Sequence, residues 1–139
     1  MAAGLDSKKI TPETTFYDSG SVTLNGKTIE NWDKKAHGKK TMTNVNEGSI
    51  TTGAVWAEKT TGHDLFYNYL VKFGLNKTTG IDFSQERVGN LTNLEKKQAR
   101  DIDFATVSFG QGIAVTPLEL INAFSAIANG GNLMRPYLN

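Results

Sequence analysis

Seven serines are spread along the chain, and a serine becomes a nucleophile only when a general base lies within hydrogen-bond reach of its hydroxyl. A lysine one helical turn later would supply such a base, but no serine or threonine has lysine three residues after it. The Gly-x-Ser-x-Gly pattern is absent as well. Cysteine is also absent, which excludes thiolate nucleophiles, disulfides and cysteine-based zinc sites. The sequence therefore predicts a chain without a catalytic nucleophile of its own.

Two other segments are candidates for acid–base chemistry. His63-Asp64 contains two members of a Ser-His-Asp triad, but triads are recognised by geometry rather than by adjacency. We interpret this pair as the first turn of a helix, where Asp64 complements the helix dipole. Lys77-Thr78-Thr79-Gly80 resembles a Lys-Thr-Gly motif with one insertion, yet its turn-rich surroundings favour a loop. With two histidines and no cysteine, we expect no metal and no cofactor.

Two more segments have residue types that bind anions or nucleic acid. Gly110-Gln111-Gly112 precedes a predicted helix, and backbone amides there could hold a phosphate. No Walker-type lysine follows, so we interpret the segment as a tight turn. A lysine cluster surrounds His37 near Trp32, but the net charge is only +1, which favours a solvated loop and no nucleic-acid partner. The cluster consists of Lys34, Lys35, Lys39 and Lys40.

The length and composition favour one folded domain. A chain of 139 residues can bury a core of its own. With 38% hydrophobic and 21% charged residues, the composition indicates neither disorder nor a membrane protein. No apolar run approaches the ~18 residues of a transmembrane helix. The first residues, 1–6, lack the basic region of a signal peptide, so we expect no membrane segment and no targeting signal.

Helices dominate the elements predicted from residue 41 onward. Thr116-Pro117-Leu118-Glu119 has the cap, the first-turn proline and the glutamate of a helix start. Upstream, Asn25-Gly26 separates two alternating runs and predicts a hairpin with strands over 17–24 and 28–32. The fold class is therefore expected to be mainly α with a small β-hairpin or loop appendage. The helices are expected near 43–49, 52–61, 63–73, 94–107 and 117–129. The expected core consists of Leu65, Phe66, Leu70, Phe104, Leu120, Ile121 and Phe124.

One long stretch is specific enough to indicate a family. The run from Ser108 to Leu120 begins Ser-Phe-Gly-Gln-Gly and continues into Thr-Pro-Leu-Glu-Leu. It follows Ala99-Arg100-Asp101-Ile102-Asp103, and Asn31-Trp32-Asp33 and Thr52-Gly53-Ala54-Val55 stand upstream in the same order. Together these stretches resemble the class B penicillin-binding proteins, the D,D-transpeptidases that cross-link peptidoglycan and are acylated by β-lactams. The resemblance covers nearly the whole chain and implies the α-helical subdomain of the transpeptidase fold.

The resemblance implies which family motifs fall within the chain. The family carries Ser-x-x-Lys, Ser-x-Asn and Lys-Thr-Gly motifs, and residues 1–6 resemble the sequence just after Ser-x-x-Lys. Ser49-Ile50-Thr51 matches Ser-x-Asn, a motif whose serine relays a proton to the nucleophile or leaving group in the family. Without a nucleophile in the chain that role has nothing to act on, so Ser49 and Thr51 are expected to form a helix–helix junction, with Thr51 or Thr52 capping the next helix. The remaining signature is the turn of Gly110, Gln111 and Gly112 with Thr116. The implied division is 1–7 as a remnant of the nucleophile helix, 8–40 as the appendage, 41–131 as the helical core and 132–139 as a tail.

Several residues depart from the family pattern. Thr51 replaces the asparagine of the second motif, Asn46 stands where a large apolar residue is usual, and Glu119 replaces glutamine. Ser84-Gln85-Glu86 stands where Pro-Gly-Glu is common. An excised subdomain exposes surface that its parent buries, and a polar residue at position 46 would avoid an apolar patch there. We interpret this as engineering, with natural drift as the alternative. The solubility explanation fails if Asn46 is buried among apolar neighbours.

Three functions remain open at this point. The favoured one is an excised, catalytically incompetent fragment of a peptidoglycan D,D-transpeptidase, engineered as a stand-alone module. The alternative is an engineered protein-binding scaffold whose recognition surface lies around 46–51 and 84–87; an active transpeptidase is the least favoured. Expected partners are another protein, the remainder of the transpeptidase domain, or a second copy bound at an apolar groove beside residues 1–3. The resemblance implies a parent anchored in the cytoplasmic membrane and working outside it.

Overall fold

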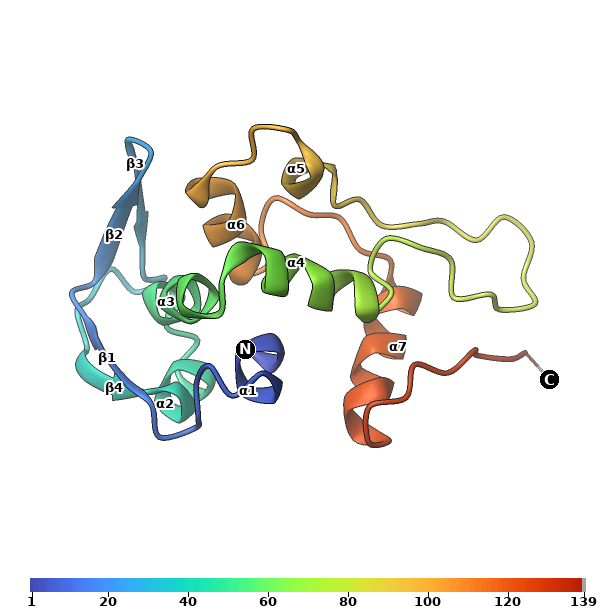
Figure 1. The fold of residues 1–139 in the computed structure, drawn as a ribbon, viewed down its shortest axis with the longest axis horizontal. Coiled ribbons are helices and arrows are strands. Elements are labelled where there is room, and N and C mark those ends of the chain that lie inside the picture. Colours follow the sequence, from blue (N-terminus) through green and yellow to red (C-terminus); the bar gives the residue numbers. More distant parts are fainter. Residues whose placement is uncertain (139) are drawn as a thin grey trace. The chain divides into compact units, whose positions relative to one another are not determined.

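The computed structural model describes residues 1–138, and the chain divides into two compact units (Figure 1). Unit 1 holds residues 1–66 and 97–112, and unit 2 holds residues 67–96 and the chain from residue 113 onward. The elements of unit 1 are α1 (Ala2–Asp6), β1 (Thr15–Asp18), β2 (Ser21–Leu24), β3 (Lys27–Glu30), β4 (Gly38–Thr41), α2 (Met42–Glu47), α3 (Thr51–Thr61) and α6 (Asp101–Ser108). Helix α4 (His63–Lys72) begins in unit 1 and continues in unit 2, which also holds α5 (Thr92–Glu95) and α7 (Pro117–Ala128).

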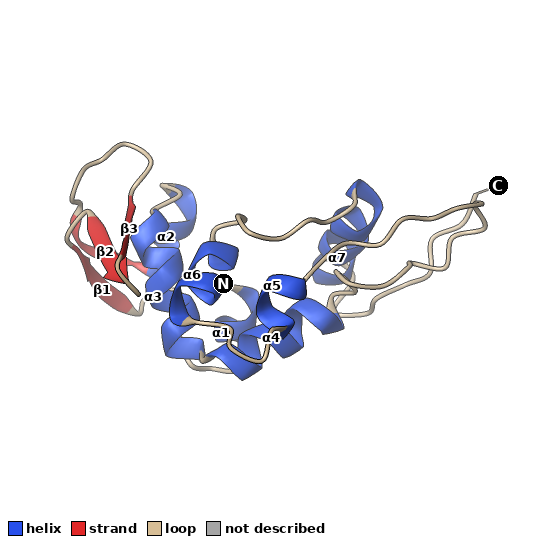
Figure 2. Cartoon of the chain, turned by 90° about the horizontal axis from the view of Figure 1, so that it is seen from above, coloured by secondary structure: helices blue, strands red, loops and turns tan. Residues whose placement is uncertain are grey.

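The expected mainly α fold class is wrong. Helices take 41% of the structure and strands 13%, and the strands form two antiparallel sheets, so the fold is mixed α and β (Figure 2). The sheet of β1 and β4 was not predicted, because β4 is Gly-Lys-Lys-Thr. This polar run lacks the alternation of a half-buried strand. Its pairing with β1 spans more than twenty residues, which no local signal encodes.

The hairpin turn is confirmed, but its first strand is not one strand. Asn25 and Gly26 both have positive φ, 48° and 76°, which is the geometry of the turn that Asn-Gly favours between β2 and β3. The run expected as one strand over 17–24 breaks at Gly20, whose φ is 89°. Its first part, β1, pairs with β4 with Thr15 opposite Thr41, whereas its second part, β2, pairs with β3.

Four of the expected helices are present with similar bounds, and the fifth is wrong. Helices α2, α3, α4 and α7 occupy the segments expected near 43–49, 52–61, 63–73 and 117–129. The helix expected over 94–107 is instead two helices, because Lys96 and Arg100 adopt extended backbone conformations between α5 and α6. The second of these helices begins where Asp103 accepts a hydrogen bond from the backbone N–H of Arg100.

Helix α3 forms the centre of unit 1, where it packs against α1, α2, α6, β1 and β3. Gly53 on this helix lies so close to Val45 and Phe16 that an added Cβ would collide with both. Phe16 in turn contacts Trp56, with ring centroids 5.9 Å apart. One buried cluster therefore joins the first sheet to α2 and α3, and it comprises Ile10, Phe16, Met42, Val45, Ile50 and Ala57.

The expected core is correct in unit 1 and wrong in α7. Phe66 and Phe104 are buried. Leu120, Ile121 and Phe124 are instead 44%, 64% and 64% exposed. The buried residues of α7 are Glu119, Ala123 and Ala126, so this helix buries its small-residue face within the described chain. Leu65 and Leu70 are half-buried. Among residues 1–138, no helix is long and apolar enough to span a bilayer.

Candidate functional site

The junction between α2 and α3 holds Ser49 in a strained conformation. Helix α2 begins with a capping box formed by Thr41 and Asn44 and ends where the Ile50 N–H donates to the Val45 carbonyl at 3.0 Å. This ending places Ser49 at a φ of 49°, a left-handed conformation that favours glycine at helix ends. Such a conformation costs a side-chain-bearing residue about 1–2 kcal/mol. Strained backbone conformations are frequent at functional sites, so Ser49 is a candidate functional residue.

A hollow of about 500 Å³ opens beside this junction, and all of its lining belongs to unit 1. Ser49 and Thr51, which carry hydroxyls, are among its lining residues, and so are Asn46 and Gln111, which carry carboxamides. The structure therefore brings together the matched second motif and the glutamine of the Gly110–Gly112 turn. The other lining residues are Met1, Trp32, Val45, Ile50, Ala54, Ser108 and Phe109.

The hollow contains hydrogen-bonding groups but no acid–base side chain. None of its lining residues is Asp, Glu, Lys, Arg or His, so no side chain there can take the proton of Ser49. Trp32 forms an aromatic edge: it is 74% exposed, and its indole N–H lies 3.4 Å from the Gly48 carbonyl oxygen. Hydroxyl and amide side chains beside an aromatic edge suit a peptide backbone. The lining also includes Met1, and burial lowers the pKa of its α-amino group.

A buried polar cluster lies behind the junction, centred on Asp18. This side chain is 0% exposed and accepts hydrogen bonds from the Thr52 hydroxyl at 2.6 Å, the Asn31 amide at 2.7 Å and the Gly20 N–H at 2.8 Å. His37 donates two more, from Nδ1 at 2.6 Å and from its backbone N–H at 3.0 Å. Burial alone would raise the pKa of Asp18, but the bonds from Thr52, Gly20 and His37 outweigh it and lower that pKa to about 2.

The sequence analysis missed this cluster, although one signal for it existed. Phe16 and Asp18 alternate along β1 and both face the protein interior. A carboxylate on the buried face of a strand requires several donors, and here they come from four different segments. His37 lies between Asp18 and Asp33, and its bond to Asp18 raises the pKa of His37 despite partial burial. The lysine cluster around His37 therefore surrounds a histidine that serves the folded structure.

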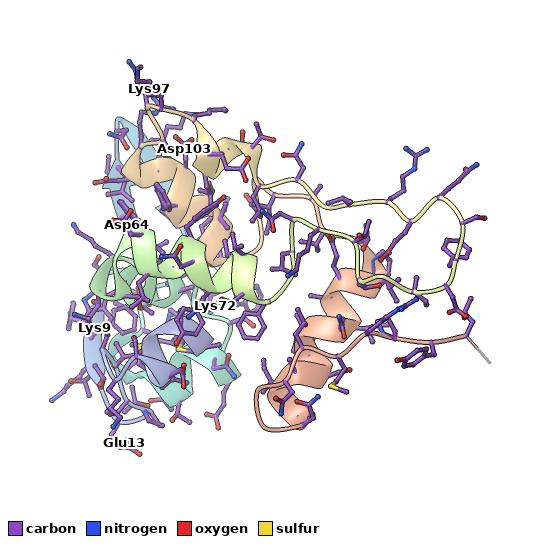
Figure 3. The ribbon with its side chains drawn as sticks, turned by 45° about the vertical axis from the view of Figure 1, so that its right-hand side comes forward. Lys9, Glu13, Asp64, Lys72, Lys97 and Asp103 are labelled. Carbon is purple, nitrogen blue, oxygen red and sulfur yellow. The ribbon has the colours of Figure 1, made fainter. Side chains whose placement is uncertain are left out.

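A second histidine cluster does not form a triad. His63 pairs with Glu58 at 2.7 Å and with Asp101 at 3.2 Å, whereas Asp64 lies on the first turn of α4 (Figure 3). Burial opposes the charged form, but these two carboxylates outweigh it and raise the pKa of His63. The small hollow beside this pair is lined by Leu24, Val55, Glu58, Lys59, Gly62, His63 and Asp101, and none of them carries a hydroxyl. No grouping that could hold a metal ion occurs within residues 1–138.

Comparison with known proteins decides the family. The family model described as the penicillin binding protein transpeptidase domain matches residues 1–139. This chain belongs to that family. Its relatives include stage V sporulation protein D of Bacillus subtilis, 34% identical over 139 residues, and the peptidoglycan D,D-transpeptidase MrdA of Escherichia coli K12, 32% identical over 145 residues. These matches cover 99% and 98% of this chain, which spans only 21% and 23% of the relatives' lengths.

Solved structures of the family share this fold. The transpeptidase domain of penicillin-binding protein 3 from Burkholderia pseudomallei has a TM-score of 0.87 and 27% identity. The peptidoglycan glycosyltransferase from Burkholderia ambifaria has a TM-score of 0.87 and 26% identity. Each alignment covers 98% of this chain and about two fifths of the other chain, 40% and 42% respectively. The penicillin-binding protein resemblance inferred from the sequence is therefore confirmed.

The family signature turn is divided between the two units. Gly110 and Gly112 have φ values of 85° and 74°, so both require glycine, and Gln111 between them lines the hollow of unit 1. Thr116 lies in unit 2, where its side chain accepts the Glu119 N–H and caps α7. The expected tight turn and the expected helix start are thus both present, with separate structural roles.

The departures from the family pattern each have a distinct environment. Asn46 is exposed, so it is not buried among apolar neighbours, and its origin by engineering stays a prediction. Gln85 has a φ of 63° at the position where the family commonly has glycine. The neighbouring Glu86 accepts hydrogen bonds from Thr79 and Gly80, which confirms a loop rather than a Lys-Thr-Gly strand at 77–80. Buried Glu119 accepts two backbone N–H groups.

Proposed function

We propose that residues 1–139 are the part of a peptidoglycan D,D-transpeptidase domain that presents Ser49 to the acyl-transfer site, and that the acylated serine is not among them. The observation that supports this function is the left-handed conformation of Ser49 at the edge of the hollow. Glycine would adopt the same backbone at lower cost, so the hydroxyl is the property that a serine adds there.

A hydroxyl at this position is suited to relay a proton. It donates one hydrogen bond and accepts others, so it can pass a proton between a nucleophile and a leaving amine while remaining neutral. Thr51 places a second hydroxyl on the same hollow, and the carboxamides of Asn46 and Gln111 can bind the backbone of a peptide substrate. The substrate class that fits these groups is the peptide stem of peptidoglycan.

Ser49 is not itself proposed as the nucleophile. No ionisable side chain lines its hollow, and no lysine follows it at the spacing that would activate it. Residues 1–139 alone are therefore proposed to be catalytically incompetent, with the nucleophile supplied by residues outside this sequence. The reaction is proposed to occur outside the cytoplasmic membrane, as in the family that the chain resembles. The alternative, an engineered binding scaffold, has the exposed Asn46 as its supporting observation.

A chimera tests the proposed role of Ser49. Residues 1–139 would replace the matching stretch of Escherichia coli MrdA, and acylation of the chimera by a fluorescent penicillin would be timed. We expect Ser49→Ala to slow acylation by roughly tenfold or more, as loss of a proton-transfer group does. The control is Ser125→Ala, an exposed serine whose hydroxyl bonds only the Ile121 carbonyl of its own helix. Equal acylation rates for the two variants, or a cooperatively folded chimera that is never acylated, would contradict the proposal.

A further inference from the structure

Helix α3 begins without a cap of its own. The first N–H groups of a helix need acceptors from outside the helix, and the N-cap residue here is Ile50, whose side chain has none. The N–H of Thr52 instead donates to Oδ1 of Asn31 at 3.1 Å, although the two residues are 21 positions apart. Asn31 therefore caps α3 from a different segment of unit 1.

The orientation of the Asn31 carboxamide is fixed by its other bonds. Its Nδ2 donates to the Asp18 carboxylate at 2.7 Å and to the Lys35 carbonyl at 2.8 Å. Both partners are acceptors, so the amide nitrogen must face them and Oδ1 must face Thr52. Asp18 also accepts the Thr52 hydroxyl at 2.6 Å. Thr52 is thus held at two atoms, its N–H by Asn31 and its hydroxyl by Asp18.

The next residue, Trp32, reaches the opposite side of the same junction. Its indole N–H lies 3.4 Å from the carbonyl oxygen of Gly48, which is the C-cap residue of α2. Asn31 and Trp32 therefore contact the residues on either side of Ser49–Thr51. We call this pair the 31–32 clamp. Asn31 is 2% exposed, which anchors the clamp in the interior, whereas Trp32 is largely exposed.

We infer that the 31–32 clamp positions Ser49 for the proton relay, an inference that rests on the proposed function. Ser49 has a strained left-handed conformation, and hydrogen bonds hold the backbone after it at two points. The Ile50 N–H donates to the Val45 carbonyl, and the Thr52 N–H donates to Asn31. If the Thr52 anchor is lost, the first turn of α3 frays and Ser49 relaxes from that conformation. Asn31, Trp32 and Asp18 act through the backbone of the junction, so they are positioning residues.

Amide hydrogen exchange in the 139-residue chain tests the clamp directly. We expect Thr52→Val, which keeps the N–H and the shape but loses the hydroxyl, to speed exchange of the Thr52 amide about tenfold through local opening. Thr52→Ser should restore slow exchange, because it returns the hydroxyl. The matched control is Thr61→Val on the same helix, equally buried at 7%, whose hydroxyl bonds only the Ala57 carbonyl. We expect that control to leave exchange at Thr52 unchanged.

Asn31→Ala removes the cap itself and should produce a larger increase at the same amide. If this variant does not fold, Trp32→Phe, which loses only the indole N–H on the Gly48 carbonyl, tests the other half of the clamp, and the series at Thr52 tests the Asp18 bond that supports it. Unchanged exchange at Thr52 in Asn31→Ala, or in both Trp32→Phe and Thr52→Val where Asn31→Ala does not fold, would overturn the inference.

The same substitutions in the MrdA chimera separate this inference from the proposed function. We expect penicillin acylation to slow in Thr52→Val and to recover in Thr52→Ser. If the Thr52 variants alter exchange while Ser49→Ala leaves acylation unchanged, the proposed function is wrong and the clamp fixes the junction for another reason. If Ser49→Ala slows acylation while Asn31→Ala and Trp32→Phe change neither exchange nor acylation, the clamp inference is wrong and the proposed function stands.

Discussion

Replacing Asp18 by asparagine should destabilise unit 1 more than any other single change in its polar cluster. The folded-state pKa of Asp18 is about 2, against 3.8 for an unperturbed carboxyl. A pKa that is lowered by folding means that the ionised form stabilises the fold above pH 3.8, and that this stability is lost as pH falls toward 2. The shift corresponds to about 2 kcal/mol at neutral pH, which Asp18→Asn would forfeit.

The variant also creates a conflict among donors. Asparagine keeps one acceptor oxygen, but its new NH₂ group would face either the three donors from Asn31 and His37 or the Gly20 N–H and the Thr52 hydroxyl. A buried donor left without an acceptor costs about 1–3 kcal/mol. We therefore expect Asp18→Asn to lower the free energy of unfolding by about 3–5 kcal/mol at pH 7. Asp33→Asn is the control, because it also removes a His37 partner but leaves the buried carboxylate in place.

Urea unfolding followed by tryptophan fluorescence is the suitable assay. Both tryptophans, Trp32 and Trp56, lie in unit 1, so the signal reports the unit that contains Asp18. We expect the stability difference between wild type and Asp18→Asn to shrink by about 2 kcal/mol between pH 5 and pH 2, as the wild-type carboxylate is protonated. A difference that is constant with pH, or an equal loss in Asp33→Asn, would refute this account of the cluster.

Three further changes test the packing and the turns. Gly53→Ala would force a methyl group against Val45 and Phe16, so we expect it to lower the free energy of unfolding by about 1–3 kcal/mol in the same urea assay. Gln85→Gly relieves a left-handed backbone and should stabilise unit 2 by about 0.5 kcal/mol, measured as a higher midpoint of thermal unfolding. Glu119→Gln keeps only one side-chain oxygen, so one of the two backbone N–H groups that bond the carboxylate loses its acceptor. We expect the free energy of unfolding to fall by about 1–2 kcal/mol, measured by urea unfolding followed by circular dichroism. No loss in the first or third, or a loss in the second, would contradict these assignments.

Local signals in the sequence predicted the local structure. Asn25-Gly26 specifies a turn with two positive φ angles, and Thr116-Pro117 specifies a capped helix start; both depend only on neighbouring residues. The Gly-Gln-Gly run and its surroundings predicted the family because they extend over many positions. The motif serine, Ser49, was found by the same resemblance, and the structure adds its strained backbone and its place beside the hollow.

Features that depend on contacts between distant segments were not predicted from the sequence. Strand β1 pairs with β4, and Asp18 at the end of β1 accepts hydrogen bonds from segments up to 34 residues away. The amphipathic stripe of α7 was recognised, but periodicity does not reveal whether a stripe is covered, and Ile121 and Phe124 on it are exposed. The break between α5 and α6 contains no glycine or proline. Its local signal was the capping bond from the Arg100 N–H to Asp103, which begins α6.

We propose that residues 1–139 contribute to acyl transfer without holding the serine that is acylated. The most direct measurement is the intact mass of the purified 139-residue chain after incubation with an excess of penicillin. The account predicts an unchanged mass, because no side chain near Ser49 can activate it as a nucleophile. A mass increase of one penicillin per chain, mapped to Ser49 or to any other serine, would contradict it.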